Sequence, residues 1–424
     1  MTDPHAVQIH WRSIATLASD YKPAKNTAGE VSKMQNKKII LSMVFIGMVI
    51  NASNYIESIL IPAIAKDFGL EIQQAGIIAT AYLVCFGVST VFAGPLADRY
   101  GKMEIIIISA ALFTVFGFIS SLSGGFLSLI IFRALCGIFA ASIFPVSNAL
   151  ISDFFSAGER QWALGVFQSV SMIGQFLCLA VLGLTMTFFS WRTGYVILAL
   201  SALFSTLMLI PIKKRAISSK NREQSFLANY LLILKESRNR QTYLIILIQG
   251  GLIFGLLSYL GAYLKSVIGL EFYITGLIIS GFGVANFVFS SLGNKLVMRM
   301  GQQGAIAAGL FFGALANGLL YFWGKSLLAL VMVPILLGLT FIFSHVSLLS
   351  MASEFSSKAR SSSLSLVAGC FISGGGLGVY TGGLVIGRLG YDAFFAIYGL
   401  VFAVLIILVL GCLKLPYFDR SRPT

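Results

Sequence analysis

The chain alternates between long apolar runs and short polar connections. Each run approaches or exceeds the roughly 20 residues that cross the membrane hydrocarbon as an α-helix. A membrane barrel would instead show alternating segments of about ten residues, so strands are not predicted. The pattern predicts an all-α polytopic membrane protein with twelve transmembrane helices, at residues 39–62, 73–96, 104–122, 126–151, 161–188, 194–212, 242–265, 272–296, 303–323, 327–351, 363–387 and 391–413.

One long polar connection separates the first six predicted spans from the last six. Its apolar stretch at 226–234 suits a short amphipathic helix on the membrane surface, or a plain linker. The N-terminal segment lacks the apolar core and cleavage site of a signal peptide. The expected order is a disordered cytoplasmic tail at 1–38, a six-helix bundle at 39–212, a cytoplasmic linker at 213–241, a second six-helix bundle at 242–413 and a cytoplasmic tail at 414–424.

The composition agrees with a membrane protein. The chain is 57% hydrophobic and 11% charged, with a mean hydropathy of +0.88, whereas soluble domains carry about 25% charged residues. This excludes a soluble cytosolic enzyme, a disordered scaffold and a disulfide-stapled secreted domain. The 5 cysteines fall inside apolar runs without the spacing of a metal site, so we assign them to packing and expect no metal.

The net charge of +14 is explained by where the basic residues lie. If the N-terminus is inside, the tails and the even-numbered loops hold 24 of the 30 Lys and Arg residues. Cytoplasmic loops carry such an excess in membrane proteins. We therefore expect a multi-pass protein of the cytoplasmic membrane, plasma or bacterial inner, with both termini cytoplasmic. Nucleic acid is not expected as a partner.

The two halves share an internal repeat. A constant shift of 200 residues aligns identical residues across four spans, which is typical of transporters built from a duplicated six-helix unit. The aligned pairs include Gly76 with Gly276, Leu96 with Leu296, Arg99 with Arg299, Gly101 with Gly301, Arg160 with Arg360, Gly174 with Gly374 and Gly183 with Gly383.

The loop after the second span has the sequence GPLADRYGK, residues 94–102, and resembles the signature GxLaDRxGrK of the major facilitator superfamily. Arg133, Gly137, Ala140 and Ala141 are similar to its RxxQGxxAA pattern, with Cys136 in place of the glutamine. A Trp-Arg pair at 191–192 is similar to a feature of the bacterial twelve-span drug and metabolite efflux branch. The resemblance covers residues 39–413.

The resemblance implies alternating access around a site near the midplane, lined by spans one, four, seven and ten. It also implies a gating role for the signature loop, which would hold the cytoplasmic side closed against the start of the eleventh span. The residues concerned are Gly94, Asp98, Arg99, Gly101 and Lys102. Plain positive-inside topology would explain the basic residues of this loop but would not require Asp98.

The fifth span departs from the antiporter pattern of the superfamily. Gly165, Gly174 and Gly183 lie at matching places, but Cys178 and Leu179 stand where a Gly-Pro pair is expected. Sequence alone therefore leaves the direction of transport open.

Away from the ends of the predicted spans, Glu57 is the only carboxylate and Arg133 is the only basic residue. An ionisable group there costs about 2.5–3.5 kcal/mol on insertion scales and is a functional candidate by default. Their predicted depths agree within a few ångströms, so the two could pair. Protonation of Glu57 would then weaken its hold on Arg133 and couple proton binding to the direction that the cavity faces. The alternatives are a static ion pair, or a Glu57 that water already reaches.

Several polar and aromatic residues are candidates for the substrate cavity. On a straight helix Asn51, Asn54, Glu57 and Ser58 share one face, and Tyr55 lies beside them. Tyrosines near a helix end also form the ordinary interfacial belt, and a lone histidine is more often a packing residue. The candidates in the second half are Gln249, Tyr259 and Tyr263 on one face of the seventh span, and His345 in the tenth.

These observations predict a secondary active transporter that exports a small amphiphilic or drug-like molecule in exchange for protons. The alternative is proton-symport uptake of a sugar, organic acid or other metabolite. HExxH, GxSxG and P-loop patterns do not occur in the sequence, which argues against an enzyme and against a nucleotide-driven pump. The expected partners are the substrate, protons and the lipid bilayer, with no cofactor. A further hypothesis is a transporter-like sensor or scaffold, and the only feature in its favour is the length of the N-terminal tail.

Overall fold

The computed structural model describes residues 27–155, 157–213, 226–355 and 360–412, and every regular element among them is helical. Residues 1–26 of the expected N-terminal tail, the C-terminal tail and residues 214–225 of the connection between the halves lie outside the described residues. The expected disordered tail is wrong for residues 27–38, which are helical and form the start of α2. The elements are α2 (Thr27–Ser53), α3 (Glu57–Phe68), α4 (Ile72–Ala75), α5 (Ile77–Tyr100), α6 (Lys102–Ser121), α7 (Phe126–Phe154), α8 (Ala157–Phe188), α9 (Trp191–Lys213), α10 (Phe226–Lys235), α11 (Ser237–Ala262), η1 (Tyr263–Val267), α12 (Phe272–Trp323), α13 (Leu327–Thr340), η2 (Phe341–His345), α14 (Val346–Ser353) and α15 (Arg360–Cys412).

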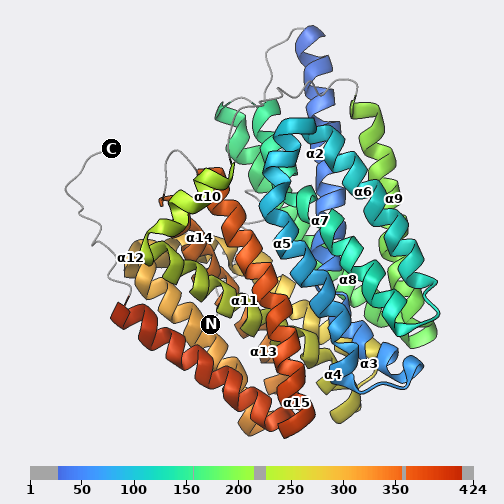
Figure 1. Cartoon of the computed structure of the whole chain (residues 1–424), viewed down its shortest axis with the longest axis vertical. Coiled ribbons are helices and arrows are strands. Elements are labelled where there is room, and N and C mark those ends of the chain that lie inside the picture. The colour runs from blue at the N-terminus through green and yellow to red at the C-terminus, as the bar shows by residue number, and fades with distance from the viewer. Residues whose placement is uncertain (1–26, 156, 214–225, 356–359, 413–424) are drawn as a thin grey trace, which may run out of the picture.

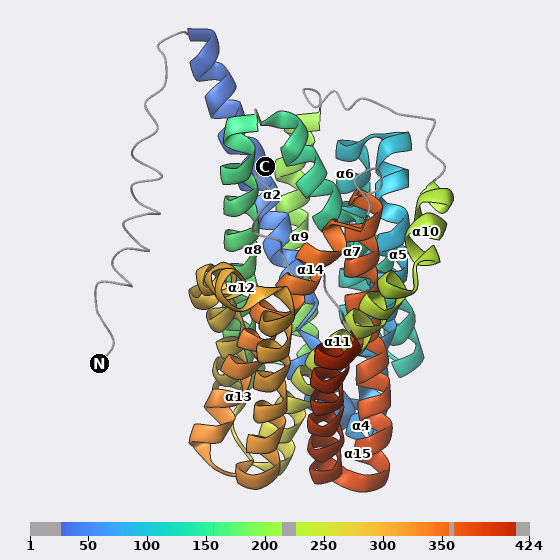
Figure 2. The same ribbon diagram turned by 90° about the vertical axis from the view of Figure 1, so that its left-hand side faces the viewer.

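Ten helices of the described chain are long and apolar enough to cross a membrane, and the bent pair α2–α3 raises the number to eleven. One of the ten, Ser362–Gly411 in α15, has 50 residues and is too long for a single crossing. Its backbone breaks at Gly390, where φ is 83°, a conformation that glycine adopts without a steric penalty. Figure 2 shows α15 folding back on itself as two arms. The helices thus supply twelve crossing segments, as the apolar pattern predicts.

The two halves lie side by side, with α2 to α9 on one side of Figure 1 and α11 to α15 on the other. The most extensive contacts between them are those of α5 with α15, α8 with α12, and α3 with α11. The short helix α10 precedes α11 and packs against α11 and α15, so it belongs with the second half. The space between the halves is where a site can form.

Glycines bring the halves together at one end of the molecule, which we call the closed side. A Cβ atom on Gly276 of α12 would lie 2.9 Å from the Cα atom of Gly183 in α8. A Cβ atom on Gly76 or on Gly383 would lie 2.3 Å or 2.4 Å from the Tyr259 hydroxyl. The shift of 200 residues converts Gly183 into Gly383 and Gly76 into Gly276. The two close approaches are therefore equivalent positions of the internal repeat.

Candidate substrate cavity and buried ion pair

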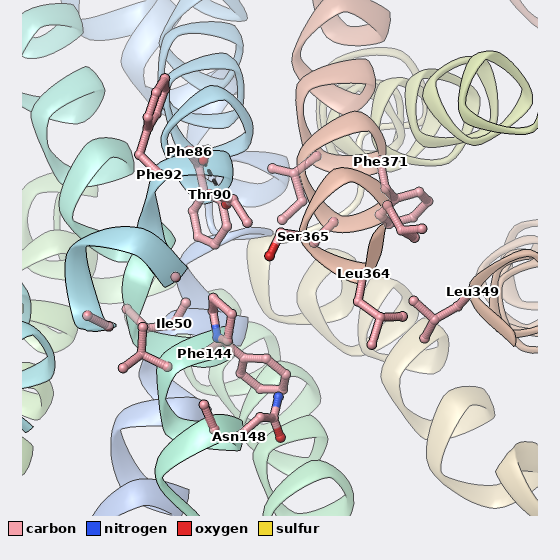
Figure 3. A pocket seen from close by; sticks show the side chains of 18 of the residues that line it. Ile50, Phe86, Thr90, Phe92, Phe144, Asn148, Leu349, Leu364, Ser365 and Phe371 are labelled. Carbon is pink, nitrogen blue, oxygen red and sulfur yellow. Dashed lines mark hydrogen bonds between the residues drawn. The ribbon is translucent and has the colours of Figure 1, made fainter. Parts of the chain in front are cut away.

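A cavity of about 1790 Å³ lies between the two halves. Its walls come from α2, α5, α7 and α8 on one side and from α10, α11, η2, α14 and α15 on the other. Figure 3 shows Phe144 and Asn148 of the first half across the cavity from Leu349 and Leu364 of the second. A space of this size between two helical bundles is large enough for a drug-sized molecule.

The signature loop forms part of the mouth of the cavity, and we call this end the open side. Gly94, Asp98, Arg99 and Lys102 line the cavity there, and Asp98 is exposed. Lys102 forms an ion pair with Asp153, with 2.6 Å between Nζ and Oδ2. No described residue forms an ion pair with Asp98. In this conformation the loop is not joined to the described part of α15 through Asp98.

Four of the predicted cavity residues line the cavity: Asn51, Asn54, Tyr55 and His345. The Tyr82 hydroxyl donates a hydrogen bond to Asn54 Oδ1, with 3.0 Å between the oxygens. The amide Nδ2 of Asn51 is buried without a hydrogen-bond partner. The Tyr55 ring stacks on Phe254, with 5.0 Å between the ring centroids. Tyr55 therefore joins the first half to an aromatic side chain of the second.

Gln249, Tyr259 and Tyr263 are not among the residues that line the cavity. Gln249 Nε2 donates a hydrogen bond to Ser344 Oγ in η2, beside His345. Tyr259 donates to the Val379 carbonyl on the closed side, with a distance of 3.1 Å. Tyr263 packs on the rings of Tyr391 and Phe395. Gln249 supports the cavity wall from behind, and the two tyrosines form part of the closed side.

His345 ends η2, a single π-helical turn in the tenth span. Such turns are rare and often lie at functional sites. The imidazole ring is 8% exposed and packs between Phe341 and Phe371, with centroid distances of 4.8 Å and 3.9 Å. Its Nδ1 atom has no hydrogen-bond partner. His345 thus contributes mainly a flat ring to the cavity wall.

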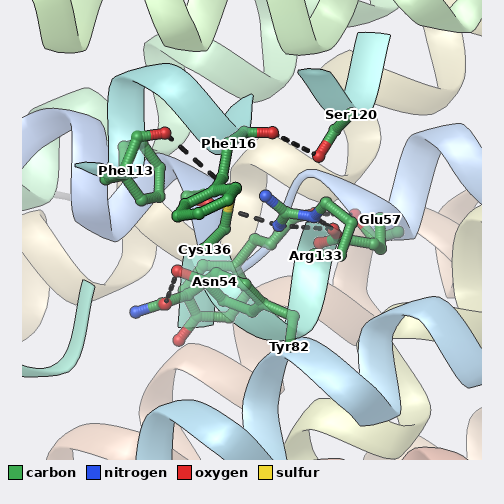
Figure 4. Close-up of polar contacts among 11 residues, drawn as sticks. Asn54, Glu57, Tyr82, Phe113, Phe116, Ser120, Arg133 and Cys136 are labelled. Atoms are coloured by element: carbon green, nitrogen blue, oxygen red, sulfur yellow. Dashed lines mark hydrogen bonds and ion pairs between the residues drawn. The ribbon is translucent and has the colours of Figure 1, made fainter. Parts of the chain in front are cut away.

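Glu57 and Arg133 form a buried ion pair, shown in Figure 4. Arg133 Nη2 lies 2.6 Å from Glu57 Oε1, and Arg133 Nε donates to the same oxygen at 2.8 Å. Glu57 is 2% exposed and Arg133 is 1% exposed. Glu57 is the only buried carboxylate among the described residues. Sequence depth alone places the two residues at one level, and the structure brings them into contact.

Aromatic rings and hydroxyl groups complete the surroundings of Arg133. Its guanidinium carbon lies 4.3 Å from the centroid of the Tyr82 ring and 5.0 Å from that of Tyr195. Such contacts stabilise a cation by about 2 kcal/mol when they are desolvated. Nη2 also lies 3.4 Å from Ser53 Oγ. Since Tyr82 bonds Asn54 at the cavity wall, these contacts connect the ion pair to the cavity.

The first span differs from the straight helix that the sequence predicts. The segment before α3 ends in i→i−3 hydrogen bonds, such as Tyr55 N to the Ala52 carbonyl at 3.1 Å, and α2 and α3 meet at a bend of 49°. Asn51 and Asn54 therefore line the cavity, while Glu57 and Ser58 are buried. The break separates two groups of residues that share one face on an ideal helix.

Tyr82, Ser53 and Tyr195 were missed from sequence. A tyrosine or serine inside an apolar span forms no distinctive pattern, and only the position of Arg133 gives these residues a role. The described residues contain no group of three or more His, Cys, Asp or Glu side chains that could hold a metal ion.

Comparisons with known proteins identify the family. The Major Facilitator Superfamily matches residues 43–360 and 274–424, and this chain belongs to it. It is a multi-pass membrane transporter and not an enzyme. Its fold is similar to that of a nucleoside transporter, with a TM-score of 0.76 at 14% identity over 89% of this chain and 100% of that one. It is also similar to the xylose transporter XylE of E. coli in a partially occluded inward-open conformation, with a TM-score of 0.68 at 15% identity over 90% and 98% of the two chains.

The curated relatives carry different cargoes. The chain is 22% identical to a cis,cis-muconate transport protein of Acinetobacter baylyi, over 63% of this chain and 70% of that one. It is 30% identical to a probable 4-methylmuconolactone transporter of Cupriavidus pinatubonensis, over 35% and 36% of the two chains. It is 32% identical to a puromycin resistance protein of Streptomyces alboniger, over 41% and 34%. The last two matches span about a third of each relative. Metabolite carriers and drug-resistance proteins are both represented.

Proposed function

We propose that this protein exports a small amphiphilic molecule across the cytoplasmic membrane in exchange for protons. The observation that carries the proposal is the buried pair of Glu57 and Arg133, which is connected to the cavity wall through Tyr82 and Asn54. A buried carboxylate inside a membrane span is costly and is therefore a default functional site.

Glu57 is the proton carrier in this mechanism, because an arginine does not lose its proton in proteins. When Glu57 takes up a proton it becomes neutral and its attraction for Arg133 falls. Arg133 then keeps the Tyr82 and Tyr195 rings as its main partners. A shift of Tyr82 would be passed to Asn54 at the cavity wall and to the break between α2 and α3. Proton binding would thus favour one orientation of the cavity over the other.

The proposed orientation places the signature loop in the cytoplasm, as the distribution of basic residues predicts. The cavity then faces the cytoplasm, and the closed side faces outward. We propose that the loop forms a cytoplasmic gate, in which Asp98 would meet the start of α15 when the cavity closes on that side. The exposure of Asp98 in the open conformation leaves it available for such a contact.

The chemistry of the cavity supports an amphiphilic cargo. Asn51, Asn54, Asn148 and Gln168 present amide groups from the first half, while the second half presents mainly aromatic and aliphatic side chains. Relatives named for drug resistance and export favour the outward direction. Relatives named for metabolites favour the alternative, uptake by proton symport.

Proteoliposomes with an imposed pH gradient separate these directions whichever way the protein inserts. An antiporter accumulates its substrate when the lumen is acidic, whereas a symporter does so when the exterior is acidic. We expect accumulation with the acidic lumen for at least one member of a panel of uncharged aromatic amphiphiles headed by radiolabelled chloramphenicol. At 100 mV one proton supplies about 2.3 kcal/mol, which sets a ceiling of roughly fifty-fold.

Protein-free liposomes control for passive partition. Accumulation with the acidic exterior would establish the uptake alternative. Proton-coupled export would be overturned if compounds entered the proteoliposomes at the same rate under either pH gradient. It would also be overturned if no compound of the panel were transported.

A further inference from the structure

We propose that the inner end of the cavity is a binding subsite for an uncharged planar ring system. The proposal rests on the cavity being the transport site and names the class of its cargo. Its basis is a continuous group of five rings that line the cavity, which we call the aromatic wall: Tyr55, Phe254, Phe341, His345 and Phe371.

The rings of the aromatic wall contact one another and come from both halves. Phe371 lies at the centre, with centroid distances of 3.9 Å to His345, 5.5 Å to Phe254 and 5.6 Å to Phe341. Tyr55 stacks on Phe254 across the boundary between the halves. Aromatic rings prefer offset-stacked or edge-to-face contacts with other rings. A planar cargo can extend this wall, whereas a saturated ring of the same size loses the aromatic contacts.

The distribution of charge argues for a neutral cargo. Among the described residues, the charged side chains that line the cavity are Asp98, Arg99 and Lys102, and all three lie on the signature loop at the mouth. Arg133 is sealed behind Tyr82 and paired with Glu57. A carboxylate at the inner end would therefore be desolvated without a countercharge. The amide groups of Asn51 and Asn54 can instead bond a neutral polar edge.

Three matched probes test this class by equilibrium dialysis against the protein in nanodiscs. Naphthalene-1-carboxamide is planar and neutral, its decahydro analogue is neutral but not planar, and 1-naphthoate is planar but anionic. We expect the carboxamide to bind roughly tenfold more tightly than either of the others. Phe371→Leu is expected to reduce the preference for the planar ring to about twofold, while Leu364→Ala near the mouth keeps it.

Empty nanodiscs correct for partition into lipid, and thermal unfolding shows whether each variant is folded. Equal binding of the decahydro compound, or tighter binding of 1-naphthoate, would overturn the subsite. Gradient-driven accumulation of other compounds would then still stand, so failure of the subsite is distinguishable from failure of proton-coupled export.

A second inference follows independently from Pro95, inside α5. Proline has no backbone N–H, so the carbonyl four residues earlier loses its helical partner. That carbonyl belongs to Val91, and the Tyr230 hydroxyl of α10 donates a hydrogen bond to it at 2.8 Å. Tyr230 is buried and lines the cavity. Pro95 thus leaves the Val91 carbonyl of the first half free to accept a hydrogen bond. Tyr230, whose helix packs with the second half, donates that bond.

We infer that the bond between Tyr230 and Val91 is a latch that stabilises the conformation open on the signature-loop side. It joins α5 to α10, and α10 packs against α11 and α15. Closing of the open side moves α5 relative to α10 and α15 and breaks the bond. Without this hydrogen bond the conformation that is open on the signature-loop side is less stable. The conformation closed on that side then becomes more populated.

A double-mutant cycle isolates the latch, because Pro95→Ala returns an N–H that can satisfy Val91 within α5. Spin labels at the exposed Arg160 and Glu354 report the distance between the halves on the open side. In the native background, Tyr230→Phe is expected to raise the fraction with a short distance several-fold. In the Pro95→Ala background the same change is expected to alter that fraction by less than about 1.5-fold.

Tyr321→Phe, at an exposed position, controls for the loss of a hydroxyl group. An equal change in both backgrounds would show that Tyr230 acts through its packing or through the hydrogen bond of its hydroxyl with Ser365, and not through Val91. An unchanged distance distribution after Tyr230→Phe would show that the bond does not hold the open state. Either result would overturn the latch.

Discussion

Arg133→Met is expected to lower the free energy of unfolding by about 3–5 kcal/mol, because it leaves Glu57 buried without its countercharge. Glu57 is 2% exposed, and its Oε1 atom contacts both Nη2 and Nε of Arg133. Chemical unfolding in detergent at neutral pH measures the effect. The exposed pair of Arg192 and Asp67 on the closed side provides a matched control. There Arg192→Met is expected to cost about 1 kcal/mol or less, since exposed pairs contribute little.

The double variant Glu57→Leu with Arg133→Met separates the structural role of the pair from its coupling role. Replacing both members of a buried ion pair by apolar residues is often neutral or stabilising, so we expect most of the lost stability to return. Gradient-driven transport is expected to stay absent. Full recovery of that transport would show that the pair only fills space. A single Arg133→Met variant as stable as the Arg192→Met control would contradict the burial argument itself.

Gly276→Leu is expected to force the closed side apart and to reduce transport at least tenfold. A Cβ atom at this position would lie 2.5 Å from the Leu179 carbonyl oxygen and 2.9 Å from the Gly183 Cα atom. Both are backbone atoms and cannot rotate away. Spin labels at the exposed Lys66 and Lys325 measure the separation of the halves on this side. The label distance is expected to lengthen in the variant.

The second arm of α12, beyond its break at Gly301, offers a control at Gly318, where an added Cβ atom would meet nothing within 4 Å. Gly318→Leu is expected to leave both the label distance and transport near their native values. If Gly276→Leu also leaves them unchanged, the contact between α8 and α12 does not hold the closed side.

The apolar pattern predicted the membrane segments because a helix needs a run of about 20 apolar residues to cross the hydrocarbon layer. It did not predict the helix break after Ser53, since Asn54, Tyr55 and Ile56 include no proline or glycine. That break is why Asn54 lines the cavity while Glu57 does not. Local composition carried no sign of it.

The candidate site could be predicted in part. Asn51 and His345 line the cavity, but Tyr259 and Tyr263 lie on the closed side. Helical periodicity predicts on which face of a helix a residue lies. It does not predict whether the two halves are separated by the cavity or packed together at that level of the membrane. In an alternating-access transporter that depends on the conformation. Tyr82 and Phe371 have roles only through neighbours from distant helices, so sequence spacing cannot identify them.

Proton coupling through Glu57 is tested most directly by measuring accumulation and exchange separately for Glu57→Gln in proteoliposomes. Glutamine imitates the protonated carboxyl group and can still bond Arg133. We expect exchange of labelled for unlabelled compound to stay within about threefold of wild type, while the pH gradient no longer drives accumulation above the equilibrium ratio. Accumulation by Glu57→Gln at the wild-type level under the same gradient would contradict coupling through Glu57.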